Sequence, residues 1–212
     1  MLNKEPGPGR AELGFKDAVL SSFKFLGDFG LRRVEEGVTL VRYESSEVFM
    51  NVYHGRASYE LGVEIGRLTE PESRLSIIDV VCWAGAETAE GFGQHVMFQV
   101  SSGEGLREFV PKLAALVKKY AVRLLRGDED AYRSALESRA KRYAEEEKEG
   151  NLRVVRSKAD AAWQAKDYAL VVDLYGPVRQ NLTEVEAKKL AYAEQQVLAA
   201  EGAAPRSSRR RR

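Results

Sequence analysis

Three consecutive stretches between Val38 and Ile65 have the composition and spacing of β-strands, and they constrain the fold more than any other part of the sequence. They are residues 38–43, 48–53 and 58–65. All three are rich in β-branched and aromatic side chains, which favour extended backbone. From Tyr59 to Ile65 every second residue is apolar, so these side chains face one side. Three strands with one apolar face are not stable alone in water, so the sequence predicts an α+β fold in which helices cover a small antiparallel sheet.

Helical patterns occur on both sides of the predicted sheet. Residues 15–29 repeat apolar side chains at helical spacing, and Gly30 follows where a left-handed residue commonly ends a helix. We expect this helix to cover the apolar face of the sheet. In the C-terminal half of the chain one helix is expected to end at Gly127, and the next to begin at the N-cap Asp128. Gly150 is expected to end that second helix.

The secondary structure of the segment that follows the three strands, residues 69–100, is less clearly indicated by the sequence. Residues 69–73 are rich in turn-forming residues and predict a loop. Ser76 and Asp79 have the spacing of a capping box, which predicts a short helix over residues 76–85. The β-branched side chains of the same segment also fit a fourth strand, although we favour the helix. Residues 94–100 have the composition of a strand.

These patterns divide the chain into four parts. A flexible arm rich in proline and glycine precedes the α+β domain, which is followed by an all-helical C-terminal module and a disordered basic tail. We place the four parts at residues 1–10, 11–127, 128–201 and 202–212.

The composition is that of a globular protein, with 44% hydrophobic and 31% charged residues. No run of about 18 apolar residues and no secretory leader is present, so we expect a cytoplasmic protein without a membrane span. Cys82 is the only cysteine, which excludes an internal disulfide and a cysteine-rich zinc site. Because Val81 and Trp83 flank it, we expect this thiol to be buried and unreactive. No cofactor or metal site is expected.

Basic residues gather in two places, although the net charge is only +1. The first is the C-terminal tail, with Arg206, Arg209, Arg210, Arg211 and Arg212; without these charges the rest of the chain has a net charge of −4. The second is a set of four cations at intervals of seven, four and three residues, which align along one face of a helix. These four, Lys112, Lys119, Arg123 and Arg126, are named the basic ridge.

Each basic group has a functional and a plain interpretation. The basic ridge is a candidate docking face for an acidic partner, or a solvated face whose last cations complement the helix dipole. The arginine tail is suited to non-specific, salt-sensitive contact with nucleic acid, or it is a solvated chain end. We favour the plain interpretation of the tail, because no aromatic or groove-reading element accompanies it.

No catalytic motif stands out in the sequence. The candidates for a hydrolase site are scattered acidic residues and one histidine: Glu44, Glu60, Glu64, Asp79 and His95. Carboxylates on strands usually face solvent, and spacing alone identifies no hydrogen-bond partner for a general base. His54 follows a predicted strand and is expected to be solvated. We therefore expect no enzymatic activity.

Residues 154–201 contain a pattern of paired helices. A first helix with small side chains is followed by the turn Lys166-Asp167-Tyr168 and a second helix. This stretch resembles the helix-turn-helix of a tetratricopeptide repeat, except that Asp167 stands where the family often has glycine. Thr183, followed three residues later by a glutamate, is expected to begin a further, incomplete unit. The resemblance implies a helical hairpin of the kind found in protein-interaction modules, but one repeat is too few for a peptide-binding superhelix.

Residues 15–145 carry four short motifs. They are Phe25-Leu26-Gly27-Asp28-Phe29-Gly30, Val41-Arg42-Tyr43-Glu44-Ser45, Ser58-Tyr59-Glu60-Leu61 and Leu124-Leu125-Arg126-Gly127-Asp128. In these motifs the segment resembles a group of small uncharacterised bacterial proteins. Proteins of this shape and size include toxin-immunity partners, so the resemblance implies an immunity-type binding protein and identifies no site residue.

Together these features predict a non-enzymatic, cytoplasmic protein-binding module, either an immunity-type inhibitor or an accessory subunit that covers a partner's surface. One alternative is a nucleic-acid-associated accessory protein that uses the basic ridge and the arginine tail. The other alternative is an uncharacterised hydrolase. The sequence indicates neither the identity of the partner nor the oligomeric state.

Overall fold

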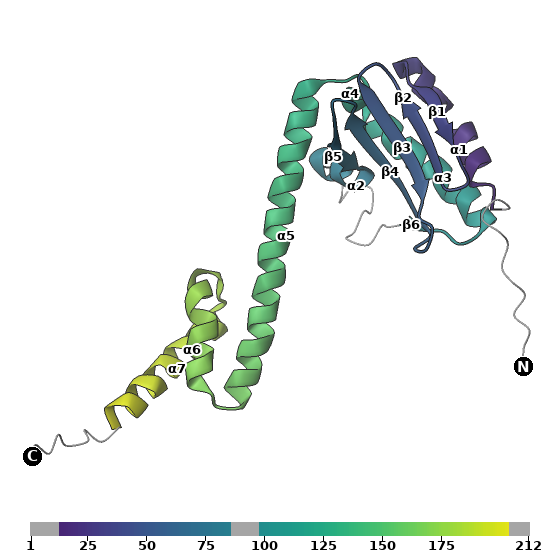
Figure 1. The fold of residues 1–212 in the computed structure, drawn as a ribbon. Helices are drawn as coiled ribbons and strands as arrows, with labels where there is room; N and C mark the ends of the chain where they lie inside the picture. Colours follow the sequence, from purple (N-terminus) through teal and green to yellow (C-terminus); the bar gives the residue numbers. More distant parts are fainter. Residues whose placement is uncertain (1–12, 86–97, 204–212) are drawn as a thin grey trace, which may run out of the picture. The chain divides into compact units, whose positions relative to one another are not determined.

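The structure, a computed structural model, describes residues 13–85 and 98–203 (Figure 1). The predicted arm at residues 1–10, His95 and the arginine tail lie outside the described residues. The chain divides into two compact units, Met1–Lys141 and Arg142–Arg212. The first is named the α+β unit and the second the helical unit.

The α+β unit contains an antiparallel sheet in which strands that follow one another in the sequence pair with one another. Its main strands are β1 (Arg32–Glu36), β2 (Leu40–Glu44), β3 (Val48–His54), β4 (Glu60–Arg67) and β5 (Glu70–Ser76). The short strand β6 (Phe98–Gln99) pairs with the start of β4. Strands β2, β3 and β4 confirm the three predicted strands, and the α+β fold class is confirmed with them.

One face of the sheet is buried beneath helices. Alternate residues of β2, β3 and β4 point into one hydrophobic core: Val41, Tyr43, Val48, Met50, Val52, Leu61, Val63 and Ile65. Helices α1 (Phe15–Ser22), α2 (Ile77–Trp83), α3 (Gly103–Tyr120) and α4 (Val122–Leu125) complete this core. Figure 1 shows α1 and α3 on the same side of the sheet. Tyr59, predicted to share the buried face, instead precedes β4 with a φ of 55° and is 37% exposed, because the chain is still turning at that residue.

The loop predicted at residues 69–73 is wrong, because β5 occupies most of that segment and pairs with β4. Turn-forming residues misled the prediction, and Pro71 is among them. Strand β5 lies at the end of the strand order, where a residue without an N–H need not break the sheet's hydrogen bonds. Leu75 anchors the strand, since its side chain is fully buried in the core.

The choice between helix and strand after residue 76 is resolved in favour of the helix. The Ser76 hydroxyl accepts a hydrogen bond from the Asp79 N–H at 3.2 Å. The Asp79 carboxylate in turn accepts one from the Ser76 N–H at 2.8 Å. This reciprocal pair is the predicted capping box, and it satisfies two N–H groups that the first turn of α2 leaves without intrahelical partners.

Glycines end two helical segments as predicted. Gly30 has a φ of 74° and Gly127 a φ of 76°, a conformation that a side chain at Cβ would strain. The single helix predicted over residues 15–29 is divided, however. It consists of α1 and the 3₁₀-helix η2 (Lys24–Phe29), with non-helical backbone at Phe23 between them.

The longest helix is α5 (Glu129–Gln164), which continues through Gly150, where the sequence predicted its end. A single glycine costs only about 1 kcal/mol relative to alanine in a helix interior, so it does not by itself end a long helix. Ala131, Tyr132 and Ala135 belong to the core of the α+β unit. The domain boundary predicted after residue 127 therefore falls inside the α+β unit, because the first turns of α5 pack there.

The helical unit contains the rest of α5, then α6 (Tyr168–Tyr175), the 3₁₀-helix η3 (Gly176–Asn181) and α7 (Glu184–Ala203). Its core is small and rich in alanine: Ala159, Ala162, Val171, Tyr175, Leu190 and Ala193. Asp167 caps α6 by accepting a hydrogen bond from the Leu170 N–H at 3.1 Å. Thr183 and Glu186 form the predicted capping box of α7, with hydrogen bonds of 2.7 and 3.3 Å. Among all helices in the described segments, none is both long and apolar enough to cross a membrane.

Candidate protein-binding surface

Three aromatic rings meet at one end of the helical unit. They belong to Trp163 near the end of α5, Tyr168 at the start of α6 and Tyr192 on α7. Their ring centroids are 5.5 to 5.8 Å apart in all three pairs, and every pair is arranged edge to face. This geometry is favourable for aromatic side chains beyond the area that they bury. We name the three residues the aromatic cluster.

Local sequence features bring the first two rings together. Lys166 adopts a left-handed conformation with a φ of 59°, and Asp167 caps the next helix. The chain therefore reverses within a few residues, so Trp163 and Tyr168 lie on either side of a tight turn. Residues 185, 188, 189 and 192 of α7 follow at helical spacing, which places Tyr192 on one face with its lysine and valine neighbours.

The aromatic cluster lines a groove of about 490 Å³. The remaining lining residues are Gln164, Lys166, Val185, Lys188 and Lys189. Tyr192 is 45% exposed and Val185 is 64% exposed, whereas Trp163 and Tyr168 are half-buried. Apolar area therefore remains accessible to solvent in the groove, and exposed apolar area of this kind commonly marks an interaction site.

Lysines surround the groove on several sides. Lys188 forms an ion pair with Glu184 at 2.6 Å, and Lys189 donates to Asp160 at 2.7 Å, which raises the pKa of Lys189. Lys166 has no ion-pair partner among the residues that the structure describes. The rim thus carries three lysines around an aromatic floor, and two of them are paired with carboxylates. Burial, followed by the neighbouring Tyr192, raises the pKa of Tyr168, so its ring remains neutral.

The basic ridge predicted from the sequence lies on the α+β unit. All four side chains are exposed, but they are not on one helix, because α3 ends at Tyr120 and a non-helical residue precedes α4. Each cation has a partner within the unit. Lys112 pairs with Glu108 at 2.7 Å, Arg123 pairs with Asp128 at 2.7 Å, Lys119 lies 4.9 Å from the ring centroid of Tyr120, and Arg126 lies 6.0 Å from that of Phe29. A role in partner binding stays a prediction for these residues.

Of the acidic residues that were considered for a hydrolase site, three share one face of the sheet and Asp79 lies on α2. Glu44, Glu60 and Glu64 lie on the polar face of the sheet, and each is already engaged. Glu44 accepts from Arg42 at 2.6 Å, Glu60 accepts from the Tyr53 hydroxyl at 3.0 Å, and Glu64 pairs with Arg74 at 3.0 Å. Asp79 caps α2 and is buried, and His95 is outside the described residues.

Polar neighbours on the same face also affect Tyr53. Burial, reinforced by the hydrogen bond to the Glu60 carboxylate, raises the pKa of the phenol well above its usual range. Tyr53 therefore remains a neutral donor to Glu60 at physiological pH. Within residues 13–85 and 98–203 no group of three or more His, Cys, Asp or Glu side chains is placed to hold a metal ion.

The burial of His54 and Cys82 differs from what the sequence predicted for each side chain. His54 was expected to be solvated, but it is only 1% exposed and stacks on Phe15 with a centroid distance of 5.7 Å. Its Nε2 donates to the Val100 carbonyl at 2.7 Å, a partner 46 residues away, which explains why local sequence gave no sign of burial. The expectation that Cys82 is buried holds only in part, since its side chain has intermediate exposure.

No known family model, curated protein or solved structure matches this chain. The aromatic cluster also went unrecognised in the sequence, although Trp163 and Tyr168 lie in the stretch that resembles a tetratricopeptide repeat. The available signal was the spacing of Val185, Lys188 and Tyr192, which marks one face of α7 as mixed aromatic and cationic.

Proposed function

We propose that the chain is a non-enzymatic protein-binding module, and that the aromatic cluster binds an acidic segment of a partner protein through an apolar anchor. The observation that carries the proposal is the groove of about 490 Å³, with its aromatic floor and lysine rim. Tryptophan and tyrosine are over-represented among the residues that dominate binding energy at protein interfaces.

The chemistry of the partner follows from the composition of the groove. An apolar side chain inserted beside Tyr192 and Val185 would bury apolar area that is now exposed. Carboxylates that flank this anchor would lie near Lys166, Lys188 and Lys189, and such charge complementarity favours fast association and selects against basic partners. The mode of action is occlusion of the partner's surface in the cytoplasm, by an immunity-type inhibitor or an accessory subunit.

Immobilised peptides provide the direct test. One series carries a single leucine or phenylalanine among glutamates, and a matched series replaces the glutamates with lysines. We expect the full-length chain to bind the acidic series, to bind it more weakly as salt increases, and to leave the basic series unbound. Equal binding of the two series would contradict the proposal.

Single substitutions locate the binding surface. Tyr192→Ala is expected to weaken binding of the acidic peptide roughly tenfold or more, and Lys188→Glu to weaken it further at low salt. Tyr143→Ala is the matched control, because Tyr143 is a 52% exposed tyrosine on α5 outside the groove. If Tyr143→Ala and Tyr192→Ala have the same effect, the aromatic cluster is not the binding surface.

A shortened chain that ends at Gly202 separates protein binding from the nucleic-acid alternative. Both versions are immobilised, and nuclease-treated native lysate is passed over each at low and at moderate salt. The acidic peptide is then added to test whether it displaces the retained protein. We expect the same protein to be retained by both versions and displaced by the peptide. Retention of nucleic acid alone, lost with the arginine tail or with salt, would favour the alternative.

A further inference from the structure

Strand β1 (Arg32–Glu36) forms an open edge of the sheet in the α+β unit. It lies at one end of the strand order and pairs only with β2 within the part of the chain that the structure describes. All five of its side chains are exposed, and Val34 is 54% exposed. The outer side of an edge strand carries backbone N–H and C=O groups that can pair with another strand. Strand β1 is therefore a surface to which a further strand can be added.

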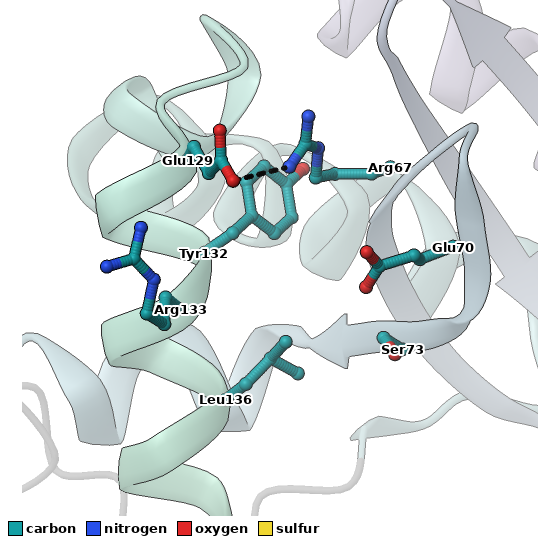
Figure 2. Close-up of a pocket in the computed structure, with 7 residues that line it drawn as sticks. All are labelled: Arg67, Glu70, Ser73, Glu129, Tyr132, Arg133 and Leu136. Carbon is teal, nitrogen blue, oxygen red and sulfur yellow. Dashed lines mark ion pairs between the residues drawn. The ribbon is translucent and has the colours of Figure 1, made fainter.

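Strand β5, at the other end of the strand order, is less open. Figure 2 shows the β4–β5 hairpin beside the first turns of α5, where Arg67 pairs with Glu129 at 3.8 Å. Further along the same helix, Arg139 donates a hydrogen bond to the Arg74 carbonyl of β5 at 2.6 Å. Pro71 of this strand has no N–H to donate to a neighbour. Of the two ends of the sheet, β1 is therefore the one suited to pairing with another strand.

Two charged residues of β1 lie on the side of the sheet that the helices cover. Arg33 lies opposite Tyr43, and Glu36 lies opposite Val41. Both residues of β2 point into the hydrophobic core. Residues directly opposite each other in an antiparallel pair share a face, so Arg33 and Glu36 are on the same face, where they form an ion pair at 3.2 Å.

The other two charged residues of β1 lie on the polar face. Arg32 lies opposite Glu44, and Glu35 lies opposite Arg42. The register between β1 and β2 shifts by one residue between Arg33 and Glu35, and this bulge brings Glu35 onto the same face as Arg32. Each face of β1 therefore carries one arginine followed three residues later by one glutamate.

We propose that β1 pairs antiparallel with β1 of a second copy of this chain, so that two copies form a homodimer with one continuous sheet. A two-fold axis perpendicular to the sheet relates the strands and keeps each face on its own side. In the proposed register Arg33 lies opposite Glu36 of the second copy, and Glu36 lies opposite Arg33 of that copy. On the polar face Arg32 is then diagonal to Glu35 of the second copy, within reach of a long side chain. All four charged residues of β1 thus lie beside an opposite charge.

Other arrangements of the two strands bring unfavourable pairs together. Parallel pairing in register places each arginine beside the same arginine of the second copy. Moving the antiparallel register by one residue in one direction sets Glu35 opposite Glu35. Moving it in the other direction sets Arg33 opposite Glu35, which lies on the other face. Charges on an edge strand usually prevent pairing because like charges meet, whereas the order Arg-Arg-Val-Glu-Glu brings unlike charges together in one register.

The dimer surface is separate from the proposed protein-binding surface, because β1 belongs to the α+β unit and the aromatic cluster belongs to the helical unit. A short strand buries little area on pairing, so the dimer is weak and forms at roughly tens of micromolar protein. Its ion pairs are exposed, so association weakens as salt increases.

Sedimentation velocity of the full-length chain, from about 5 to about 500 micromolar, tests the proposal. We expect the mass to rise with concentration toward that of two chains. Arg32→Glu with Arg33→Glu makes the charges of β1 all acidic, and Glu35→Arg with Glu36→Arg makes them all basic. Each double variant should associate at least about tenfold more weakly than the parent, because like charges meet. An equimolar mixture of the two should regain association, because an acidic strand then faces a basic one.

Two control variants separate strand pairing from net charge. Arg33→Glu with Glu36→Arg exchanges the two charges and keeps the strand complementary to itself, so this variant should dimerise like the parent. Lys141→Glu with Lys158→Glu changes the net charge as the acidic variant does, but at exposed lysines of α5, and should also dimerise. A parent chain that stays monomeric at about 500 micromolar would overturn the proposal. So would a mixture that fails to associate, or a dimer that persists in both charge-reversed variants, which would place the contact on another surface.

Discussion

The two units of this chain differ in how completely they bury their apolar side chains. The α+β unit buries large side chains from a sheet and the helices packed on it, among them Phe15, Leu106 and Leu113. The helical unit buries six residues, and three of these are alanines. Yet the helical unit leaves Val185 and Leu198 more than 60% exposed.

Helical repeats in general bury their apolar faces only when they stack. Each repeat of a solenoid buries its apolar faces against neighbouring repeats, and a lone unit cannot do so. The helical unit has few large buried side chains, and Tyr192 of its aromatic cluster is 45% exposed. Under the proposed function, a partner protein covers this apolar area. The predictions below test whether the two units are unequal in this way.

The largest effect is expected from the core of the α+β unit. Leu113 on α3 is fully buried, so Leu113→Ala should lower the free energy of unfolding of this unit by about 2–5 kcal/mol. Leu198→Ala is the control, because this leucine of the helical unit is 67% exposed and its loss should change stability by less than about 0.5 kcal/mol. Urea unfolding measures both. Equal losses would break the contrast between the units.

A smaller effect is expected from the core of the helical unit. Leu190→Ala should cost about 2 kcal/mol, the lower end of the usual range, because its alanine-rich surroundings can close partly around the gap. The two tryptophans are placed to report separately, with Trp83 in the α+β unit and Trp163 in the helical unit. Fluorescence of Trp83→Phe and Trp163→Phe backgrounds should assign the loss to the helical unit alone. A shift seen equally by both tryptophans would show one cooperative transition instead of two.

The same small change can be made in both units at tyrosines whose buried hydroxyls lack partners. Tyr132→Phe and Tyr175→Phe each remove an unmatched polar atom, so each should raise the stability of its own unit by about 1 kcal/mol. Thermal unfolding checks the direction. Destabilisation by both substitutions would mean that the hydroxyls are satisfied.

The smallest changes in stability are expected at low pH, where one stabilising carboxylate in each unit becomes protonated. The hydrogen bond from Arg123, helped by the Ala131 N–H, lowers the pKa of Asp128. At Glu186, burial acts to raise the pKa, but hydrogen bonds from Thr183 and Arg156 outweigh it and lower the pKa overall. A carboxylate whose pKa is lower in the folded state than in the unfolded state stabilises the fold. Its full contribution is present at a pH above the unfolded pKa, about 4, and is lost as the pH falls through the folded pKa.

Amide substitutions test this sign. Asp128→Asn and Glu186→Gln should be less stable than the parent at pH 6, and the difference should shrink toward zero near pH 2. Urea unfolding at the two pH values measures it, with Glu72→Gln as an exposed control. A difference that grows on acidification would contradict the assignment of these carboxylates as stabilising.

Much of the fold follows from signals within a few residues. The alternation in β4, the capping residues Ser76 and Thr183, and the left-handed Gly30 depend on neighbours in the sequence, and all were predicted. Predictions failed where distant contacts override local preference. Turn-forming residues became β5 because β4 pairs with them, and α5 continues through Gly150 because one unfavourable residue is outweighed by the rest of a long helix.

The amino-acid sequence by itself determined the three central strands, several helix ends and the class of the fold, because hydrophobic periodicity and capping act over at most one or two turns of backbone. Only the tertiary structure decided which side chains meet. It brings Tyr192 on α7 against Trp163 on α5, and it places His54 Nε2 within hydrogen-bond distance of the Val100 carbonyl. It also sets the Tyr132 hydroxyl beside Arg67. Burial and pairing between residues far apart in the sequence depend on how whole elements pack, and no local pattern specifies that.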